Sequence, residues 1–413
     1  MAKIIPFKGL RPEKELAAEV ATLPYDVVSV AEAREFRKDP YNFYHVTRSE
    51  IDLPDTVDVH SAEVYEQAKI NLDAMIRDKI LVQDTRPCYY IYELVMDGRS
   101  QTGLVCGSSI DDYNDGIIKK HEFTRPEKEL DRINHIKATG AQTGIVFLAY
   151  NDCDSVQHII AEWKMAHQPE YDFTAKDGIR HIFWVINDDT KVAAITQHFA
   201  ADVPCTYIAD GHHRAASAAK VCKEMRDAGK YADGSEPFNY FVTCIFPASQ
   251  LQIMDYNRVV KDLNGMIPNE LIQALQKDFE VTRRGNEAVK PTQAHEFGMY
   301  LAGDWYRLVA KEGTYTHDPI GILDITILQQ NVLDKLLGIK DQRVDRRIDF
   351  VGGIRGMAAL QQRVNNKDAA VAFSIYPVTI KQLFDIADSG EVMPPKSTWF
   401  EPKLRDGLVV YMI

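Results

Sequence analysis

The chain has no long apolar segment. None of its apolar runs reaches the roughly 18 residues that a helix needs to span a bilayer. The N-terminal sequence MAKIIPFK also lacks the apolar core and the cleavage site of a secretory signal peptide. The sequence therefore predicts a cytoplasmic protein that does not interact with membranes.

The common signatures of nucleotide and metal sites are also missing. The sequence contains no G-x-x-x-x-G-K-[ST] phosphate loop and no protein-kinase motif set. No C-x-x-C or H-x-x-x-H spacing of the kind that holds zinc lies near a candidate site. The six cysteines are scattered, mostly within apolar strands, which indicates reduced and buried thiols.

The chain has fewer positively charged than negatively charged residues. The 48 Lys and Arg residues face 60 Asp and Glu residues, for a net charge of −12. A general nucleic-acid binder is normally basic, so nucleic acid is not expected as a partner. The 413 residues, 45% of them hydrophobic, suffice for two or three globular domains.

Strands and helices are predicted to alternate in the middle of the chain, which favours an α/β (mixed α+β) fold. We expect an α/β core over 1–263, with an insertion-like helix and hairpin region at 61–150, and a smaller α+β part over 264–413. Aromatic residues at 41–47 predict another strand, and 323–337 reads as one long helix. The alternating elements are predicted at 144–150, 155–165, 181–186, 188–200 and 205–209.

The densest group of reactive side chains is an Asp-Gly-His-His-Arg run between a short apolar strand and an alanine-rich helix. A strand-to-helix turn presents free N–H groups and the positive end of the helix dipole. Gly211 permits a sharp turn and close approach of a ligand, and Arg214 suits phosphate. His212 and His213 can donate to phosphate or move protons, whereas Asp210 fits a metal ligand or a proton acceptor. An exposed turn that caps a helix is the alternative.

A second polar cluster precedes and begins a helix that is predicted from Pro126. Its members on the helix fall at spacings that share one face. The cluster reads either as a solvated charged face or as a loop and helix that clamp an anionic substrate. One anion-binding turn is too little to hold both donor and acceptor, so we predict that both clusters line one cleft. The second cluster consists of His121, Glu122, Arg125, Lys128, Asp131 and Arg132.

Two further segments are candidates. Tyr25 and Asp26 follow a proline at a strand end or turn, where Asp26 reads either as a turn acid or as a substrate contact. Near the other end, a loop rich in proline, lysine and aromatic residues carries Lys396, Trp399 and Lys403. It reads either as a rigid turn that covers a sheet edge or as a lid over the cleft.

Four motifs, in order and across nearly the whole chain, together resemble domain-of-unknown-function family 1015. The motifs are Tyr25-Asp26-Val27-Val28, His121-Glu122-Phe123-Thr124 with Lys128 and Asp131-Arg132, Asp210-Gly211-His212-His213-Arg214, and Met393-Pro394-Pro395-Lys396-Ser397-Thr398-Trp399-Phe400.

The Asp210–Arg214 motif also resembles the phosphate-binding turn of the ParB/sulfiredoxin superfamily, which includes kinases of free serine. The resemblance implies a ParB/sulfiredoxin-like core elaborated with additional mixed-sheet and helical segments. Sulfiredoxin has a cysteine where this chain has His212, which disfavours redox repair. No helix-turn-helix DNA domain is apparent, which disfavours chromosome partitioning.

The leading hypothesis is a small-molecule phosphotransferase, a kinase of free L-serine or a similar hydroxyl compound. The expected cofactor is a nucleotide (ATP or ADP) or pyrophosphate, with Mg²⁺. The alternative is a ParB-like nucleotide-binding regulatory switch, and a homo-oligomer is compatible with either. The expected catalytic residues are Asp210, His212, His213 and Glu122. Cofactor binding is expected of Gly211, Arg214, His121, Arg125, Lys128, Arg132, Lys396 and Lys403. Substrate binding is expected of Tyr25, Asp26, Asp131 and Trp399.

Overall fold

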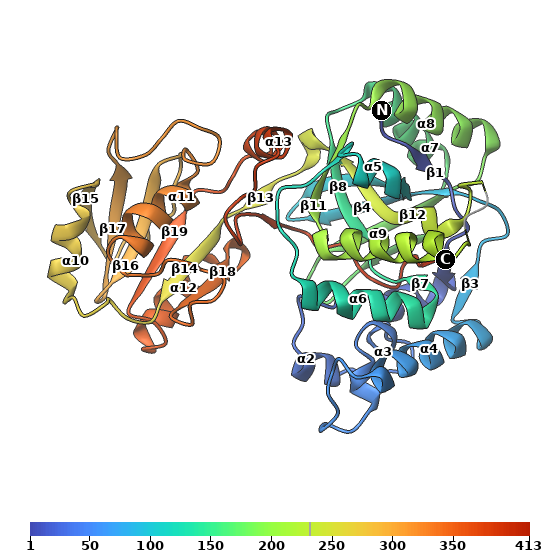
Figure 1. The fold of residues 1–413 in the computed structure, drawn as a ribbon, viewed down its shortest axis with the longest axis horizontal. Coiled ribbons are helices and arrows are strands. Elements are labelled where there is room, and N and C mark those ends of the chain that lie inside the picture. The colour runs from blue at the N-terminus through green and yellow to red at the C-terminus, as the bar shows by residue number, and fades with distance from the viewer. Residues whose placement is uncertain (231–232) are drawn as a thin grey trace. The chain divides into compact units, whose positions relative to one another are not determined.

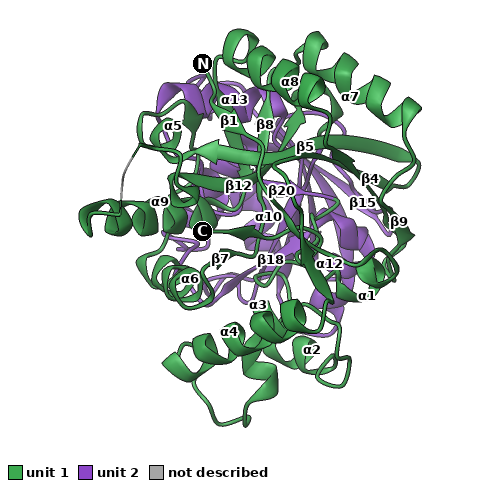
Figure 2. Ribbon diagram, turned by 90° about the vertical axis from the view of Figure 1, so that its right-hand side faces the viewer, with its two compact units in different colours: residues 1–251, 402–413 green, residues 252–401 purple. Residues whose placement is uncertain are grey.

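The computed structural model describes residues 1–230 and 233–413, which form two compact units (Figure 2). Unit 1 comprises residues 1–251 and 402–413, and unit 2 comprises residues 252–401. Each unit combines helices with sheets, so the predicted mixed α/β class is confirmed. No helix within the described ranges is both long and apolar enough to cross a membrane.

Unit 1 is built on a mixed sheet of nine strands (Figure 1). The strand order is β6-β11-β8-β12-β5-β4-β10-β9, with β1 added to β5. The pairs β6–β11 and β8–β12 are parallel and the other pairs are antiparallel. The strands are β1 (Ile4–Ile5), β4 (Tyr89–Met96), β5 (Arg99–Ser109), β6 (Ile118–Lys119), β8 (Val146–Tyr150), β9 (Tyr171–Thr174), β10 (Arg180–Ile186), β11 (Thr206–Asp210) and β12 (Tyr240–Pro247).

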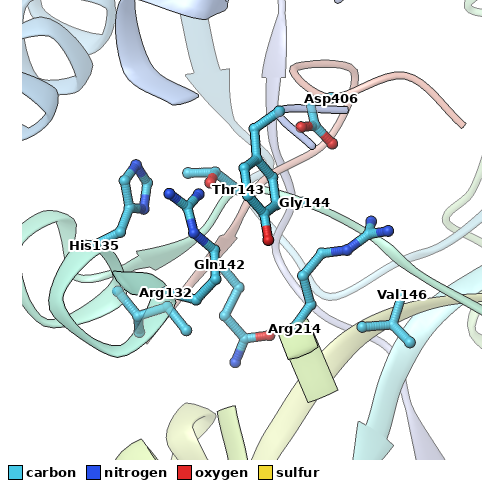
Figure 3. A pocket seen from close by; sticks show the side chains of 10 residues that line it. Arg132, His135, Gln142, Thr143, Gly144, Val146, Arg214 and Asp406 are labelled. Atoms are coloured by element: carbon cyan, nitrogen blue, oxygen red, sulfur yellow. The ribbon is translucent and has the colours of Figure 1, made fainter. Parts of the chain in front are cut away.

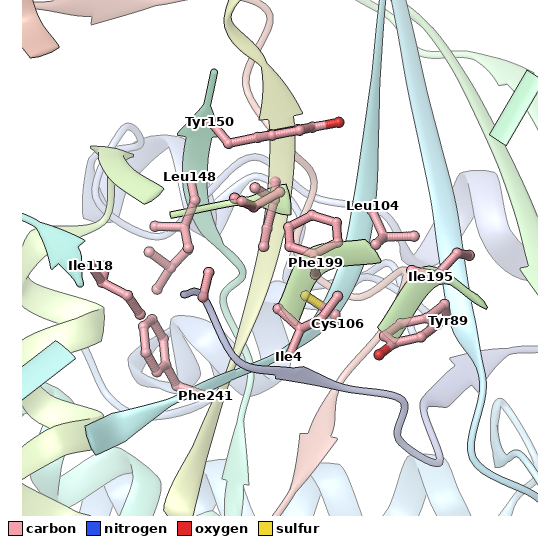
Figure 4. Close-up of a cluster of buried hydrophobic side chains, with 14 of the residues drawn as sticks. Ile4, Tyr89, Leu104, Cys106, Ile118, Leu148, Tyr150, Ile195, Phe199 and Phe241 are labelled. Carbon is pink, nitrogen blue, oxygen red and sulfur yellow. The ribbon is translucent and has the colours of Figure 1, made fainter. Parts of the chain in front are cut away.

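Helices pack on this sheet through apolar side chains. Ile195 and Phe199 of α8 are fully buried, and Figure 4 shows them in one cluster with Leu104, Leu148 and Tyr150 of the sheet. The alanines of α9 join the same cluster, because small side chains allow a helix to approach a sheet closely. The helices are α1 (Ala17–Val20), α2 (Val30–Arg34), α3 (Tyr44–Thr47), α4 (Ala62–Arg77), α5 (Ile110–Asn114), α6 (Pro126–Thr139), α7 (Asp154–Ala166), α8 (Asp189–Asp202) and α9 (His212–Asp227).

The prediction of a strand at 41–47 is wrong, because this segment contains the short helix α3. Phe43 and Val46 are both fully buried, and their spacing of three residues places them on the same side of a helical turn. Aromatic composition suggested a strand, but the burial pattern follows a helix.

Residues 402–413 return to unit 1 after the chain has completed unit 2. Thr22 pairs with Asp406 and Leu10 with Val410, and β21 (Tyr411–Met412) pairs with β7 (Ala141–Gln142). Another two-stranded pair joins β2 (Leu10–Pro12) to β3 (Leu81–Gln83). The tail segment is therefore part of unit 1, although the sequence placed it in the smaller C-terminal part.

Unit 2 is an antiparallel sheet in the order β15-β17-β16-β19-β14-β18. Because β14 pairs with β18 and β19, this unit starts at residue 252 and not at 264 as predicted. A ribbon of β13 (Ile253–Met254) and β20 (Trp399–Phe400) joins the two ends of the unit. The other strands are β14 (Tyr256–Val260), β15 (Phe279–Gly285), β16 (Glu296–Leu301), β17 (Asp304–Ala310), β18 (Ile348–Gly352) and β19 (Val371–Ile375).

The helices of unit 2 include one that departs from prediction. The long helix expected at 323–337 is α-helical only over α11 (Asp324–Leu328), and a π-helical segment (Gln329–Asp334) continues it. The other helices are α10 (Pro268–Leu275), α12 (Gly356–Asn365) and α13 (Ile380–Ser389).

Asp324 begins α11 as a buried carboxyl. Its Oδ1 accepts a hydrogen bond from the His295 N–H at 2.8 Å, and its Oδ2 has no partner among the described residues. Burial raises the pKa of Asp324 to about 7, because the charged form loses its hydration. The carboxyl therefore holds its proton more tightly in the folded than in the unfolded chain.

We predict that Asp324→Asn changes the pH dependence of stability. A carboxyl whose pKa is raised by folding costs stability as the pH rises from its unfolded pKa near 4 to its folded pKa near 7. The gain of the variant over the unchanged protein should therefore grow between pH 4 and pH 8, by up to about 4 kcal/mol. Urea unfolding across this range measures it, with Glu391→Gln at an exposed position as the control. A gain that does not vary with pH would contradict the prediction.

Candidate active site

The Asp-Gly-His-His-Arg run forms the junction between β11 and α9. Asp210 ends β11, Gly211 is the N-cap with φ +96°, and His212 is the first residue of α9. The predicted strand–turn–helix placement is thus confirmed. No side chain caps the helix here, so the N–H groups of its first turn remain available to a ligand.

Asp210 is held by two cations. Lys403 Nζ lies 3.2 Å from Asp210 Oδ2, and Arg214 Nη2 lies 3.6 Å from the same oxygen. Burial alone would raise the pKa of Asp210, but Lys403 and Arg214 hold it well below its usual range. The carboxylate therefore stays ionised and is a weak base, which does not fit its predicted role as proton acceptor.

Two glycines make room for the Arg214 side chain. A Cβ on Gly211 would lie 3.0 Å from Arg214 Nε, and a Cβ on Gly144 would lie 3.1 Å from its Cδ. The buried guanidinium donates from Nη1 to the Ile145 carbonyl, and its Nε has no partner among the described residues. A charged donor without a partner is costly to bury, so a ligand that accepts from Nε would be favoured.

The two polar clusters lie together in the structure. The His121 N–H donates to His212 Nε2 at 3.5 Å, and the two rings meet edge to face with centroids 4.5 Å apart. Glu122 Oε2 lies 3.9 Å from His212 Nδ1. The Arg125 N–H donates to His213 Nε2 at 3.0 Å. The loop before α6 therefore contacts the first turn of α9, and the cleft that both clusters are expected to line stays a prediction.

Burial keeps the histidines of this site neutral. It lowers the pKa of His121 to about 4 and that of His212 well below its usual value, and His121 lowers the latter further. Burial also lowers the pKa of His213. Positive charge at the turn therefore comes from Arg214 and Lys403 and not from the imidazoles. His121 is itself buried and packs against the His212 ring.

Contacts between α6 and α9 fix the second half of the site. Glu129 pairs with Lys220, and its carbonyl accepts a hydrogen bond from Ser217 Oγ at 3.1 Å. One turn further along α6, Arg132 pairs with Asp131 at 2.7 Å and lies over the Tyr25 ring at 3.8 Å. The cation of Arg132 is therefore held in place next to the phenol.

Two cavities adjoin at Arg132. The smaller has a volume of about 20 Å³, and Figure 3 shows Arg132, Arg214 and Asp406 around it. The larger measures about 390 Å³ and shares Tyr25, Arg132 and His135 with the smaller. Its remaining lining is Asp26, Thr47, Arg48, Ser49, Glu50, Val59, His60, Val64, Tyr65, Glu127, Lys128 and Asp131.

The predicted lid is divided between the units. Lys403 belongs to unit 1 and contacts Asp210. Lys396 and Trp399 belong to unit 2, where both lie near the Tyr256 ring, at 5.7 Å and 4.8 Å. The 393–403 stretch is therefore divided between the two units, and the roles of Lys396 and Trp399 remain predictions.

Sequence reasoning missed Asp406, a buried acid that lines the small cavity. It also missed Arg48 and Tyr65, which line the large one. The one available signal for Asp406 was a pair of charged residues, Arg405-Asp406, directly before an apolar run at the chain's C-terminal end.

The residues present do not form a dedicated metal cage. Within the described part of the chain, no group of three or more His, Cys, Asp or Glu side chains could hold a metal ion. Asp210, the predicted metal ligand, already pairs with Lys403 and Arg214. The expected Mg²⁺ therefore stays a prediction.

A family model described as "Protein of unknown function (DUF1015)" matches residues 4–326. No curated protein matches the chain. Among solved structures, a free serine kinase variant in complex with AMP aligns at 12% identity and TM-score 0.36, covering 72% of this chain and 86% of that one. A conserved hypothetical protein from Pyrococcus furiosus aligns at 14% identity and TM-score 0.36, covering 75% and 95%. C-terminally truncated SbnI from Staphylococcus aureus aligns at 11% identity and TM-score 0.37, covering 74% and 86%. A likeness at this level does not identify a ligand or a site in this chain.

We predict that Gly211→Ala damages both the fold and the turn. A side chain at φ +96° costs about 1–2 kcal/mol of stability, and its Cβ would also displace the Arg214 guanidinium. Gly229→Ala is the matched control, because Gly229 has φ +73° and open space around it. Both variants should lose stability in urea unfolding, but only Gly211→Ala should weaken binding of inorganic phosphate. Equal phosphate binding by the two variants would contradict the prediction.

Proposed function

The chain belongs to the DUF1015 family of proteins of unknown function, and on this premise we propose that it is a small-molecule phosphotransferase. It would pass a phosphoryl group from ATP, ADP or pyrophosphate to the hydroxyl of a small acceptor such as free L-serine. One observation carries the proposal: at an uncapped helix N-terminus, Lys403 and the buried Arg214 provide positive charge, and Arg214 lines a small cavity that shares three lining residues with a cavity of small-molecule size.

The β11–α9 turn supplies the phosphate side. Free N–H groups at the start of α9, together with Arg214 and Lys403, provide donors and positive charge at one place. Phosphate oxygens would compete with Asp210 for Lys403 and would also accept from the unused Nε of Arg214. This charge persists across the physiological pH range, because it does not depend on protonated histidine.

The large cavity supplies the acceptor side. Its volume of about 390 Å³ suits a small polar molecule, and its lining carries both charges. Lys128 and Arg132 can face a carboxylate, and Asp26 and Asp131 an ammonium group, which is why a free amino acid is the first acceptor to test. Arg132 lines both cavities, so donor phosphate and acceptor hydroxyl would meet beside it.

Phosphoryl transfer needs little covalent chemistry from the protein beyond positioned charge and a base for the attacking hydroxyl. In the proposed reaction the acceptor oxygen bonds to phosphorus while the bridging P–O bond of the donor breaks. Arg214 and Lys403 offset the negative charge that develops, and the released phosphate product stays at the turn until it dissociates.

A nucleotide-binding switch without transfer is the second candidate function. The low pKa of Asp210 favours it, because the acid within the turn itself is a weak base. Incubation with ATP, ADP or pyrophosphate, with and without L-serine and Mg²⁺, separates the two by ³¹P NMR. Formation of a phosphate ester supports the transferase. Binding that raises the melting temperature, without transfer to any small hydroxyl compound, supports the switch.

We predict that Lys403→Met weakens ATP binding by about 1.5–3 kcal/mol, the usual loss for a hydrogen bond to a charged group. Lys403→Arg keeps the charge and should retain most of the affinity. The matched control is Lys223→Met, which removes an exposed lysine of α9 that pairs with Asp227. Calorimetric titration with ATP measures all three variants. Equal affinity of Lys403→Met and Lys223→Met would remove Lys403 from the phosphate site.

A further inference from the structure

Asp406 is a buried acid that neither the motifs nor the proposed phosphate site accounts for. Its backbone is fixed by two hydrogen bonds with Thr22, at 2.9 Å and 3.1 Å, and the residue is only 2% exposed. These contacts hold the segment that follows Lys403 against the N-terminal part of unit 1. The position of the carboxyl is therefore determined by the backbone and not by an ion pair of its own.

The Asp406 carboxyl lines the small cavity. Its Oδ2 has no hydrogen-bond partner among the described residues. Arg214 of the phosphate turn and Arg132 of the acceptor cavity line the same space (Figure 3). A volume of about 20 Å³ accommodates one water molecule. An unpaired buried carboxylate oxygen thus lies where the two halves of the proposed site adjoin.

The two buried acids of the site differ in their partners. Asp210 has Lys403 and Arg214 within 4 Å, and both lower its pKa. The pKa of Asp406 is raised to about 7, mainly by burial. Arg214 and Arg132 act to lower this pKa, and the charge of Asp26 acts to raise it. A general base works best when its pKa lies near the working pH. A hydrogen bond from the Tyr25 backbone also lowers the pKa of Asp406, and the other titratable groups that interact with it are the phenols of Tyr44 and Tyr92.

We propose that Asp406 is the general base of the transfer, taking the proton of the acceptor hydroxyl through one water in the small cavity. This assignment rests on the function proposed above. The O–H bond of the acceptor breaks as its oxygen bonds to phosphorus, and the bridging P–O bond of the donor breaks in the same step. The proton passes through the water to Asp406, and the electron pair of the broken P–O bond leaves with the rest of the donor, as ADP from ATP, AMP from ADP or phosphate from pyrophosphate.

The test is the steady-state rate of transfer from ATP to L-serine, measured from pH 5 to pH 9. In the unchanged protein kcat should rise with pH, with its midpoint near pH 7 and a plateau above it, since Asp406 must be ionised to accept a proton. Asp406→Asn should lower kcat by about 100-fold or more, leave KM for ATP within about twofold, and remove this rise. Asp406→Glu, which keeps a carboxylate, should retain the rise with part of the rate.

Two variants separate this assignment from the alternatives. Asp324→Asn removes the other buried acid with a raised pKa, in unit 2, and should leave kcat and the pH profile unchanged. Asp210→Asn should alter ATP binding but keep the rise near pH 7. Loss of the rise in Asp210→Asn and its persistence in Asp406→Asn would transfer the role to Asp210.

The outcomes also distinguish failure of the Asp406 assignment from failure of the proposed phosphotransferase function. Transfer by the unchanged protein with equal kcat and pH profile in Asp406→Asn overturns the assignment and leaves the function standing. If thermal melting shows that Asp406→Asn does not fold, the unchanged protein supplies the test. A kcat that stays constant from pH 5 to pH 9 then overturns the Asp406 assignment. No transfer from ATP, ADP or pyrophosphate to any small hydroxyl compound overturns both.

Discussion

The ion cluster of Asp210, Lys403 and Arg214 is the contact on which the site depends. Lys403 and Asp210 are 193 residues apart in the chain, yet their charged atoms lie 3.2 Å apart with both side chains largely shielded from water. Charges buried in this way are costly unless they are paired, so the three groups stabilise one another's position. Removing Asp210 would leave two cations without their shared carboxylate at the start of α9.

The partners of each ionisable group decide its protonation state in this site. Asp210 stays ionised because it has two cations, whereas Asp406 is close to half-protonated near neutrality because burial outweighs its more distant arginines. Loss of hydration also lowers the pKa of His121 and His212, and for His212 it outweighs the Glu122 carboxylate 3.9 Å away. Similar residue types therefore serve different purposes within a single site.

Local patterns predicted the elements whose chemistry is local. The strand predicted at 181–186 is β10 (Arg180–Ile186), and the helix predicted at 188–200 is α8 (Asp189–Asp202). The proximity of the two polar clusters was predicted because one anion-binding turn is too little to hold both donor and acceptor. Asp406 could not be found in this way, because it becomes significant only through burial and through neighbours that are distant in sequence. For the same reason, the return of residues 402–413 to unit 1 was not visible in the composition of the tail.

The insertion of unit 2 between residues 251 and 402 has a consequence for the order of synthesis. Asp210, Gly211 and Arg214 leave the ribosome well before Lys403 and Asp406, which are translated only after all of unit 2. Until then the nascent chain carries a phosphate turn with neither its lysine nor its second acid. The site can therefore be completed only after unit 2 has been translated. A chain whose translation stops within unit 2 cannot assemble the site.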